Sequence, residues 1–215
     1  MKHLNLLVFV GSLMVNLLSP QLSQAATYDE AINGDLSNDR LNPSFLALTD
    51  SPVGANGLSG NNIISGRIGA VNGVVDRDYL HIIVPTGYVW SELRLGNQTT
   101  VGGNGSFIGL AAGSTIPIPP NAINASGLLG YKVYGAADLS NNILNAMAVS
   151  GNGSSGFNSP LGAGDYTLWI QELATGNFNY RFNLIITAVP EANTYIMLLV
   201  GLVLTGFAAR RKTIE

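Results

Sequence analysis

The chain has 215 residues, a formal net charge of −3, 11% charged residues and no cysteine. Without cysteine it can form no disulfide, and it offers no thiol nucleophile and no Cys-ligated metal centre. Its charges are scattered and form no basic face, so we expect no nucleic-acid partner. The 26 glycines of this weakly charged chain indicate β-structure with many turns.

The first 25 residues are typical of a secretory signal peptide. Lys2 gives a positive start, and an apolar run follows at residues 4–18. Small residues at positions 23 and 25 suit signal peptidase. We therefore predict export through the Sec machinery and cleavage after Ala25, with Ala26 as the second choice. An N-terminal anchor that is never cleaved is the alternative.

Residues 26–188 remain for one folded domain with its own core. After a turn-rich stretch, short runs of alternating or β-branched residues follow one another between Gly, Asn and Pro turns. Such runs predict half-buried strands. The predicted strands are 45–48, 62–68, 78–84, 89–95, 107–111, 130–134, 165–173 and 178–187. Residues 143–149 fit either a strand or a helical turn.

Alternation in the run 89–95 gives each residue a face of the predicted strand. Trp90 falls on the opposite face from Leu93 and Leu95. An exposed Trp90, or exposed tyrosines, could stack on sugar rings, which makes carbohydrate binding one hypothesis for this domain.

The last two predicted strands are expected to form a hairpin. Residues 165–173 place Tyr166, Leu168 and Ile170 on one face, and residues 178–187 alternate in the same way. The segment 174–177 between them has the composition of a tight turn. Paired side by side, their aromatic faces would make stabilising cross-strand contacts.

About eight short strands with regular turn signals predict an all-β fold, an antiparallel β-sandwich of jelly-roll or Greek-key type. Five short stretches are similar to segments of a known domain family. They are NGDLSND at 33–39, ISGRI at 64–68, DRDY at 76–79, VPTG at 84–87 and AGDYTL at 163–168. They resemble bacterial pre-peptidase C-terminal-type β-sandwich domains. The resemblance implies the same fold and a non-catalytic module of a secreted protein.

Few residues could support catalysis, and we expect no enzymatic activity. His3 belongs to the predicted signal peptide, so a Ser-His-Asp triad would need His81, which lies within a predicted strand. Glycoside hydrolysis needs two carboxylates at a defined separation, and the sequence defines none. A polysaccharide-acting enzyme is the less favoured alternative. Its candidate carboxylates are Asp76, Asp78, Glu92, Asp165 and Glu172.

Calcium is a possible ligand, although no cofactor is required by any motif. Ca²⁺ prefers carboxylate and carbonyl oxygens presented by loops. Asp35, Asp39, Asp76 and Asp78 lie in predicted turns that a sandwich could bring together. Neither segment completes an EF-hand loop, and Asp is also a common turn former for backbone reasons. These residues are our candidate calcium ligands.

The tail, residues 189–215, has three parts in a fixed order. A short motif comes first, an uncharged run at 192–209 follows, and a basic cluster comes last. As a helix the run would span roughly 27 Å, close to the hydrocarbon thickness of a bilayer. Basic residues at a membrane helix end stay on the cytoplasmic side. We therefore predict a single C-terminal transmembrane helix, with the rest of the chain outside the cytoplasm.

This tail resembles the PEP-CTERM sorting signal of Gram-negative bacteria. In that family a Pro-Glu-Pro-like motif precedes a short transmembrane helix and an Arg-rich end. The resemblance implies recognition by an exosortase at Val189, Pro190 and Glu191, with cleavage near the motif after an inner-membrane intermediate. It gives the orienting role to Arg210, Arg211 and Lys212. Ala192 stands where the family usually has a second proline. An ordinary anchor that is never cut is the alternative.

Together these features predict an exported protein of the cell surface, outer envelope or extracellular space. The resemblance to PEP-CTERM proteins implies a link to exopolysaccharide or biofilm matrix, so a structural or adhesive role is the leading hypothesis. A carbohydrate-binding module is the alternative.

Overall fold

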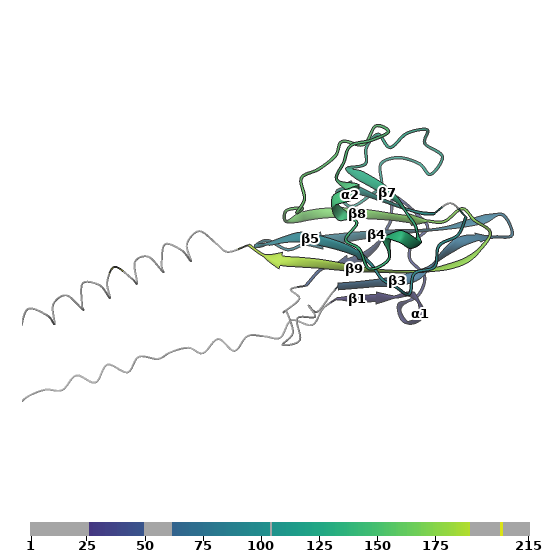
Figure 1. Cartoon of the computed structure of the whole chain (residues 1–215), viewed down its shortest axis with the longest axis horizontal. Helices are drawn as coiled ribbons and strands as arrows, with labels where there is room; N and C mark the ends of the chain where they lie inside the picture. Colours follow the sequence, from purple (N-terminus) through teal and green to yellow (C-terminus); the bar gives the residue numbers. More distant parts are fainter. Residues whose placement is uncertain (1–25, 50–61, 104, 190–202, 204–215) are drawn as a thin grey trace, which may run out of the picture.

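The computed structural model describes residues 26–49, 62–103, 105–189 and 203. Over these residues the chain forms a curled sheet of nine strands, with the order β5-β9-β3-β4-β8-β6-β7 (Figure 1). Two short strands lie off this path, where β1 pairs with β3 and β2 with β4, both in parallel. The strands are β1 (Thr27–Asp29), β2 (Ser44–Ala47), β3 (Asn62–Val71), β4 (Val74–Val84), β5 (Tyr88–Leu95), β6 (Ser106–Ala112), β7 (Gly130–Tyr134), β8 (Gly164–Gln171) and β9 (Gly176–Ala188). The short helical elements are α1 (Glu30–Asn33), the 3-10 turn η1 (Ala136–Asp138) and α2 (Leu144–Met147).

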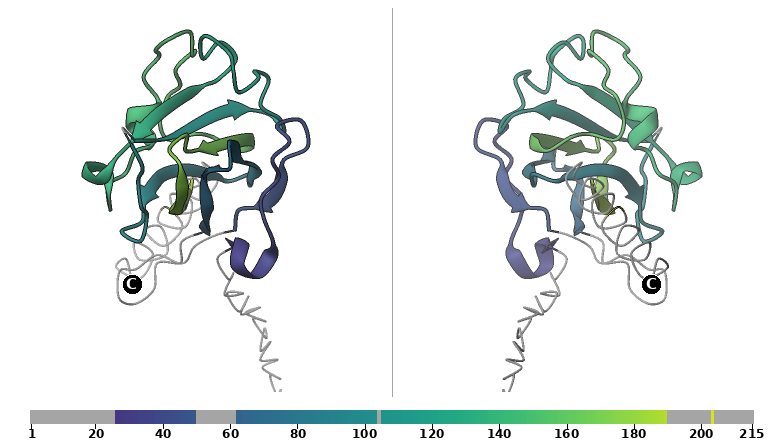
Figure 2. Two further views of the ribbon diagram at one scale, coloured as in Figure 1. Left: turned by 90° about the vertical axis from the view of Figure 1, so that its right-hand side faces the viewer. Right: turned by 90° about the vertical axis from the view of Figure 1, so that its left-hand side faces the viewer.

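The β3–β4 hairpin is where the sheet curls. Its strands pair only beside their turn, at 69–71 with 74–76. Asn72 and Gly73 form that turn with φ of 53° and 79°, as a type I′ hairpin turn requires. Further along, β3 pairs with β9 and β4 pairs with β8. The two arms therefore diverge into facing halves of one sheet, which Figure 2 shows from the ends of the molecule.

The main core fills the space between these halves. Ile64 of β3 and Phe182 of β9 come from one half, and Leu80 of β4 and Leu168 of β8 come from the other; all four are fully buried. Removal of this apolar surface from water is the main stabilising contribution to the fold. A second apolar cluster around Trp169 lies on the outer face of β8, so this strand is buried on both faces.

The all-β prediction is confirmed, and each predicted run contains a strand. Most pairs are antiparallel, and the sheet is continuous through the β3–β4 hairpin. Residues 143–149, which fitted either a strand or a helical turn, contain the one-turn helix α2.

The predicted hairpin between β8 and β9 is wrong. β8 pairs with β4 and β6, whereas β9 pairs with β3 and β5. The segment between them crosses from one half of the curled sheet to the other. The alternation was assigned correctly, because Tyr166 and Phe182 both face the main core. The alternation defines a buried face, but the same face can be buried in either half.

The prediction of an exposed Trp90 is also wrong. The register between β5 and β9 shifts between Trp90 and Glu92, which marks a β-bulge. The extra residue turns Trp90 to the same side as Leu93, and both side chains are 0% exposed. The indole Nε1 donates to the Glu92 carbonyl at 2.7 Å. Trp90 is therefore a core residue and cannot stack on a sugar.

The predicted processing segments lie almost entirely outside the described residues. This applies to the signal peptide with Ala25, to Pro190 and Glu191, and to Arg210, Arg211 and Lys212. Val189 is described, and its side chain is exposed. Within the described part of the chain, no helix has the length and apolar character needed to cross a membrane.

Candidate functional site

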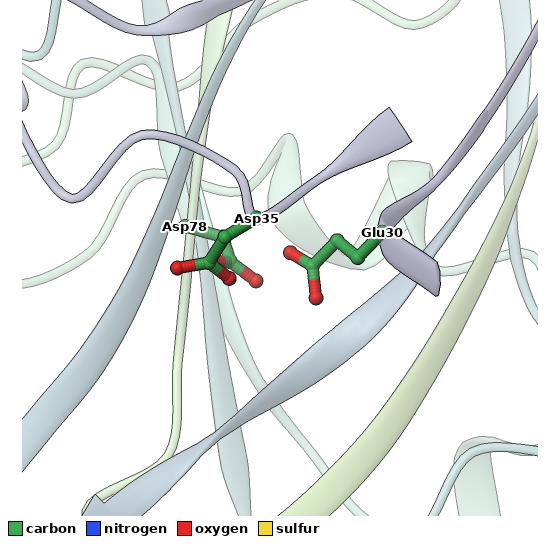
Figure 3. A group of neighbouring side chains, drawn as sticks. All are labelled: Glu30, Asp35 and Asp78. Carbon is green, nitrogen blue, oxygen red and sulfur yellow. The ribbon is translucent and has the colours of Figure 1, made fainter. Parts of the chain in front are cut away.

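Three carboxylates converge at one end of the curled sheet. Glu30 of α1, Asp35 of the following loop and Asp78 of β4 each place a carboxylate oxygen within 4.8 Å of the other two. Figure 3 shows the three side chains pointing toward a common space. They come from two distant parts of the sequence, so the cluster exists only in the folded chain.

The N-terminal segment, residues 26–36, places two of these carboxylates, Glu30 and Asp35, beside the sheet. β1 pairs with β3, and α1 begins directly after it. Asp29 caps this single turn by accepting from Ala31 N–H at 3.0 Å. Gly34 then reverses the chain with φ of 90°, and Leu36 is 1% exposed in the main core. Asp35 is therefore fixed between a helical turn and a core anchor.

The Glu30 carboxylate lies on β3 and is held there by hydrogen bonds. Its Oε2 accepts from Arg67 N–H at 2.8 Å. Its Oε1 accepts from Leu36 N–H and from the Tyr180 hydroxyl, each at 3.2 Å. A Cβ at Gly66 would lie 2.4 Å from this carboxylate, so glycine at that position lets Glu30 approach the strand.

Replacing Gly66 with alanine is expected to displace Glu30 and to destabilise the fold. The lost hydrogen bonds should lower the free energy of unfolding by about 1 kcal/mol, because the displaced group is the end of a flexible side chain and burial already raises the pKa of Glu30. Gly135→Ala is the matched control, because a Cβ there meets nothing within 4 Å. Denaturant unfolding of the full chain measures both variants. Equal stability of the two would show that the close approach at Gly66 is unimportant.

Asp78 is the unusual member of the cluster. Its side chain is 0% exposed, and neither carboxylate oxygen has a hydrogen-bond partner among the described residues. Burial, followed by repulsion from Glu30, raises the pKa of Asp78 to about 9. The Tyr180 hydroxyl lies near enough to offset part of this rise, but its proton is donated to Glu30.

Glu172 shows how this chain satisfies another buried carboxylate. It is 3% exposed, and it accepts from Gly102 N–H at 3.1 Å, from Ser106 Oγ at 2.8 Å and from Ala174 N–H at 2.8 Å. Buried polar groups in proteins are almost always paired in this way. Asp78 departs from the rule in the same domain.

A polar pocket of about 790 Å³ opens beside the cluster. Glu30, Asp35 and Asp76 line it, together with Arg67 and Arg181. Burial raises the pKa of Asp76, whose Oδ1 accepts from Asn38 Nδ2 at 3.2 Å. The pocket gives water and small solutes access to the exposed side of the carboxylates.

The candidate calcium ligands predicted from the sequence are divided by the fold. Asp35 and Asp78 lie together, and Asp76 lines the adjacent pocket. Asp39 is part of a separate local turn, where its carboxylate accepts from Asn42 Nδ2 and Leu41 N–H, and these bonds lower its pKa. Calcium binding itself stays a prediction.

Glu30 was missed in the sequence analysis. Its only local signal is its position next to Asp29 in an acidic, turn-rich segment. The parallel pairing of β1 with β3 brings Glu30 to Asp78, and no local sequence pattern predicts that pairing.

The other carboxylates considered for catalysis have structural partners. Glu92 pairs with Arg94, and Asp165 Oδ1 lies 2.7 Å from His81 Nε2 across the β4–β8 pair. The His81 ring also contacts Phe45, with ring centroids 5.3 Å apart. His81 therefore makes contacts with side chains on both neighbouring strands, Phe45 of β2 and Asp165 of β8.

A comparison with protein families found a match for the tail. The family model of the PEP-CTERM protein-sorting motif matches residues 188–212. This confirms the sorting-signal identification for the tail. The comparisons with curated proteins and with solved structures found no match. The resemblance of the folded part to pre-peptidase C-terminal-type domains stays a prediction.

Proposed function

We propose that this chain, which carries a PEP-CTERM protein-sorting motif, is exported and then processed by an exosortase for delivery to the cell surface or the extracellular space. The observation that carries the proposal is the family match at residues 188–212. The predicted order of motif, apolar helix and basic cluster supports an inner-membrane intermediate, in which the helix retains the chain and the basic end stays in the cytoplasm. A signal peptide ending at Ala25 would begin this route.

The position of the motif relative to the sheet supports processing without damage to the fold. β9 ends at Ala188, and this strand is paired on both sides, with β3 and with β5. Val189 N–H still donates to the Gly87 carbonyl at 2.8 Å. Cleavage near Glu191 would therefore fall after the last strand, and the whole described domain would be released or transferred.

We further propose that the delivered domain is a non-catalytic β-sandwich of jelly-roll or Greek-key type, with a structural or adhesive role in an exopolysaccharide or biofilm matrix. Two of the carboxylates considered for catalysis already have structural partners, which supports a non-catalytic role: Glu92 pairs with Arg94, and Glu172 accepts three hydrogen bonds. The carbohydrate-binding alternative has lost one of its predicted contacts, because Trp90 is buried in the core, and the tyrosine contacts stay a prediction.

Mass spectrometry of the C-terminal peptide from the native host tests the sorting proposal. We expect chains from the surface or medium to end near Glu191 and to lack the apolar run. If the peptide through Arg210 persists in the inner membrane and no shorter form exists, the tail is only an anchor.

Variants of the motif make this test specific. The double substitution Pro190→Ala and Glu191→Ala is expected to leave at least tenfold more uncut chain in the membrane. Ala192→Pro restores the proline that the family usually has there, and it should be cut at least as completely as the wild type. Thr213→Ala, beyond the basic cluster, is the control and should be processed normally. Equal processing of all variants would contradict recognition at this motif.

A further inference from the structure

The convergence of Glu30, Asp35 and Asp78 is more than a group of neighbouring acidic residues. Asp78 is fully buried, points into the cluster and has two carboxylate oxygens without a hydrogen-bond partner among the described residues. We propose that these three carboxylates bind a divalent cation, with Ca²⁺ the best fit, and that the cation fastens the N-terminal segment to the curled sheet.

The ligand chemistry selects a hard cation. All three side chains offer oxygen, and Ca²⁺ is bound by carboxylates, carbonyls and water at 2.3–2.6 Å. Two oxygens on one Ca²⁺ can thus be separated by at most about 5 Å. The three oxygens here lie within 4.8 Å of one another, so a single ion can contact all of them. Zinc is disfavoured because its usual nitrogen and sulfur ligands are missing from the cluster.

The electrostatics of Asp78 favour the same conclusion. The charged groups with the strongest effect on it are Glu30, Asp76 and Asp35, and all of them are anionic. A buried carboxylate ordinarily needs a cation or a set of hydrogen bonds, and Glu172 in this domain has such bonds. A divalent ion beside Asp78 would supply the missing partner for both of its oxygens.

The surroundings leave room for the remaining ligands. Glu30 and Asp35 line the polar pocket of about 790 Å³, whereas Asp78 lies buried beneath them. Water entering from the pocket can complete the six to eight oxygen contacts of Ca²⁺. Three hydrogen bonds already hold Glu30 in a fixed orientation, so little ordering would be needed when the ion binds.

Binding would add a link between two parts of the chain that β1 pairing, Leu36 and the Glu30 hydrogen bonds already join. β1 has three residues, and α1 has four residues, none of which is buried. A cation shared with Asp78 of β4 would link this segment across the end of the sheet. Extracellular calcium modules commonly have dissociation constants near 10⁻⁴–10⁻³ M, so loading would follow export. That last step rests on the proposed export, but the binding itself can be tested without it.

Thermal unfolding of the full chain in mild detergent tests the proposal. The protein is first treated with a chelator and then titrated with CaCl₂ at pH 8, with MgCl₂ as a comparison. At a Ca²⁺ concentration about 100 times the dissociation constant, we expect the melting temperature to rise by about 5–10 °C. No rise at 10 mM CaCl₂ would overturn the proposal.

Three variants locate the effect. Asp35→Asn changes an exposed residue and should fold normally, but it should weaken the response at least tenfold in Ca²⁺ concentration. Asp78→Asn should abolish the response. Asp39→Asn is the matched control, because Asp39 belongs to a separate turn, and it should respond as the wild type does. A wild-type response in both Asp35→Asn and Asp78→Asn would place the ion elsewhere and overturn the assignment.

A second readout covers the case in which Asp78→Asn does not fold. Tb³⁺ replaces Ca²⁺ at oxygen sites, and a nearby tyrosine sensitises its luminescence. The Tyr180 hydroxyl contacts Glu30, so we expect tyrosine-excited Tb³⁺ emission that CaCl₂ displaces. The emission should fall at least fivefold in Asp35→Asn and remain in Asp39→Asn. Equal emission from these two variants would contradict the site.

Discussion

Replacing Trp90 with alanine is expected to lower the free energy of unfolding by about 3–5 kcal/mol, the usual cost of truncating a large aromatic residue in a core. The Trp90 side chain is 0% exposed, and its ring meets Tyr166 edge-on with the centroids 6.3 Å apart. Its backbone N–H also donates to the Leu161 carbonyl at 2.7 Å, so the side chain is held where β5 meets a distant loop.

Phe45→Ala is the control for this experiment. Phe45 is also aromatic, but it is 54% exposed, and its loss should cost less than about 1 kcal/mol. Denaturant unfolding of the full chain compares the two variants. If Trp90→Ala were no less stable than Phe45→Ala, Trp90 would be a surface residue, and sugar stacking on it would become a reasonable hypothesis again.

Stability without divalent cations is expected to fall as the pH rises from 5 to 8. Burial and neighbouring carboxylates raise the pKa of Asp78 to about 9 in the folded chain, from an ordinary value of 3.8. Between these values the folded state keeps a proton that the unfolded state has lost. The stabilisation is therefore complete below about pH 4 and disappears as the pH rises toward 9. Each pH unit in this window costs up to roughly 1.4 kcal/mol, so the expected fall from pH 5 to 8 is about 2–4 kcal/mol.

Asp78→Asn isolates this effect, because asparagine stays neutral throughout the range. Urea unfolding at several pH values, in the presence of a chelator, should give a flatter profile for this variant. Glu30 and Asp76 also have raised pKa values, so a smaller fall in the same direction should remain. Asp39→Asn should leave the profile unchanged, because the pKa of Asp39 is lowered and its contribution is lost only at more acidic pH. A wild-type profile that is flat or rises with pH would show that Asp78 is ionised without a cation.

Much of the fold follows from local sequence patterns. Period-two alternation identified the buried faces of β8 and β9, because the pattern itself records which side of a strand leaves water. The Asn72-Gly73 turn also has a local sequence signal, since Asn-Gly between apolar runs is a strong hairpin indicator. The bulge at Ser91 left no such signal, and it reversed the expected environment of Trp90.

The candidate site was only partly predictable for a similar reason. Asp35, Asp76 and Asp78 were predicted as calcium ligands because carboxylates in turns are suited to calcium, but only Asp35 lies in a loop, and Asp76 and Asp78 lie within strand β4. Whether they meet depends on contacts between strands far apart in sequence. The parallel pairing of β1 with β3 brought in Glu30, and the local turn at Asp39 kept that residue away.

The sequence by itself determined that the tail carries a sorting motif and that the folded part is all-β. The sorting motif at 188–212 is read from its residues in linear order, and strand alternation is a property of neighbouring residues. Only the tertiary structure decided which strands pair, that Trp90 is buried and that Asp78 is buried beside Glu30 and Asp35. Those outcomes depend on how the two arms of the β3–β4 hairpin separate around one core. A local pattern can specify which face of a strand is buried, but it cannot specify which distant strand covers that face.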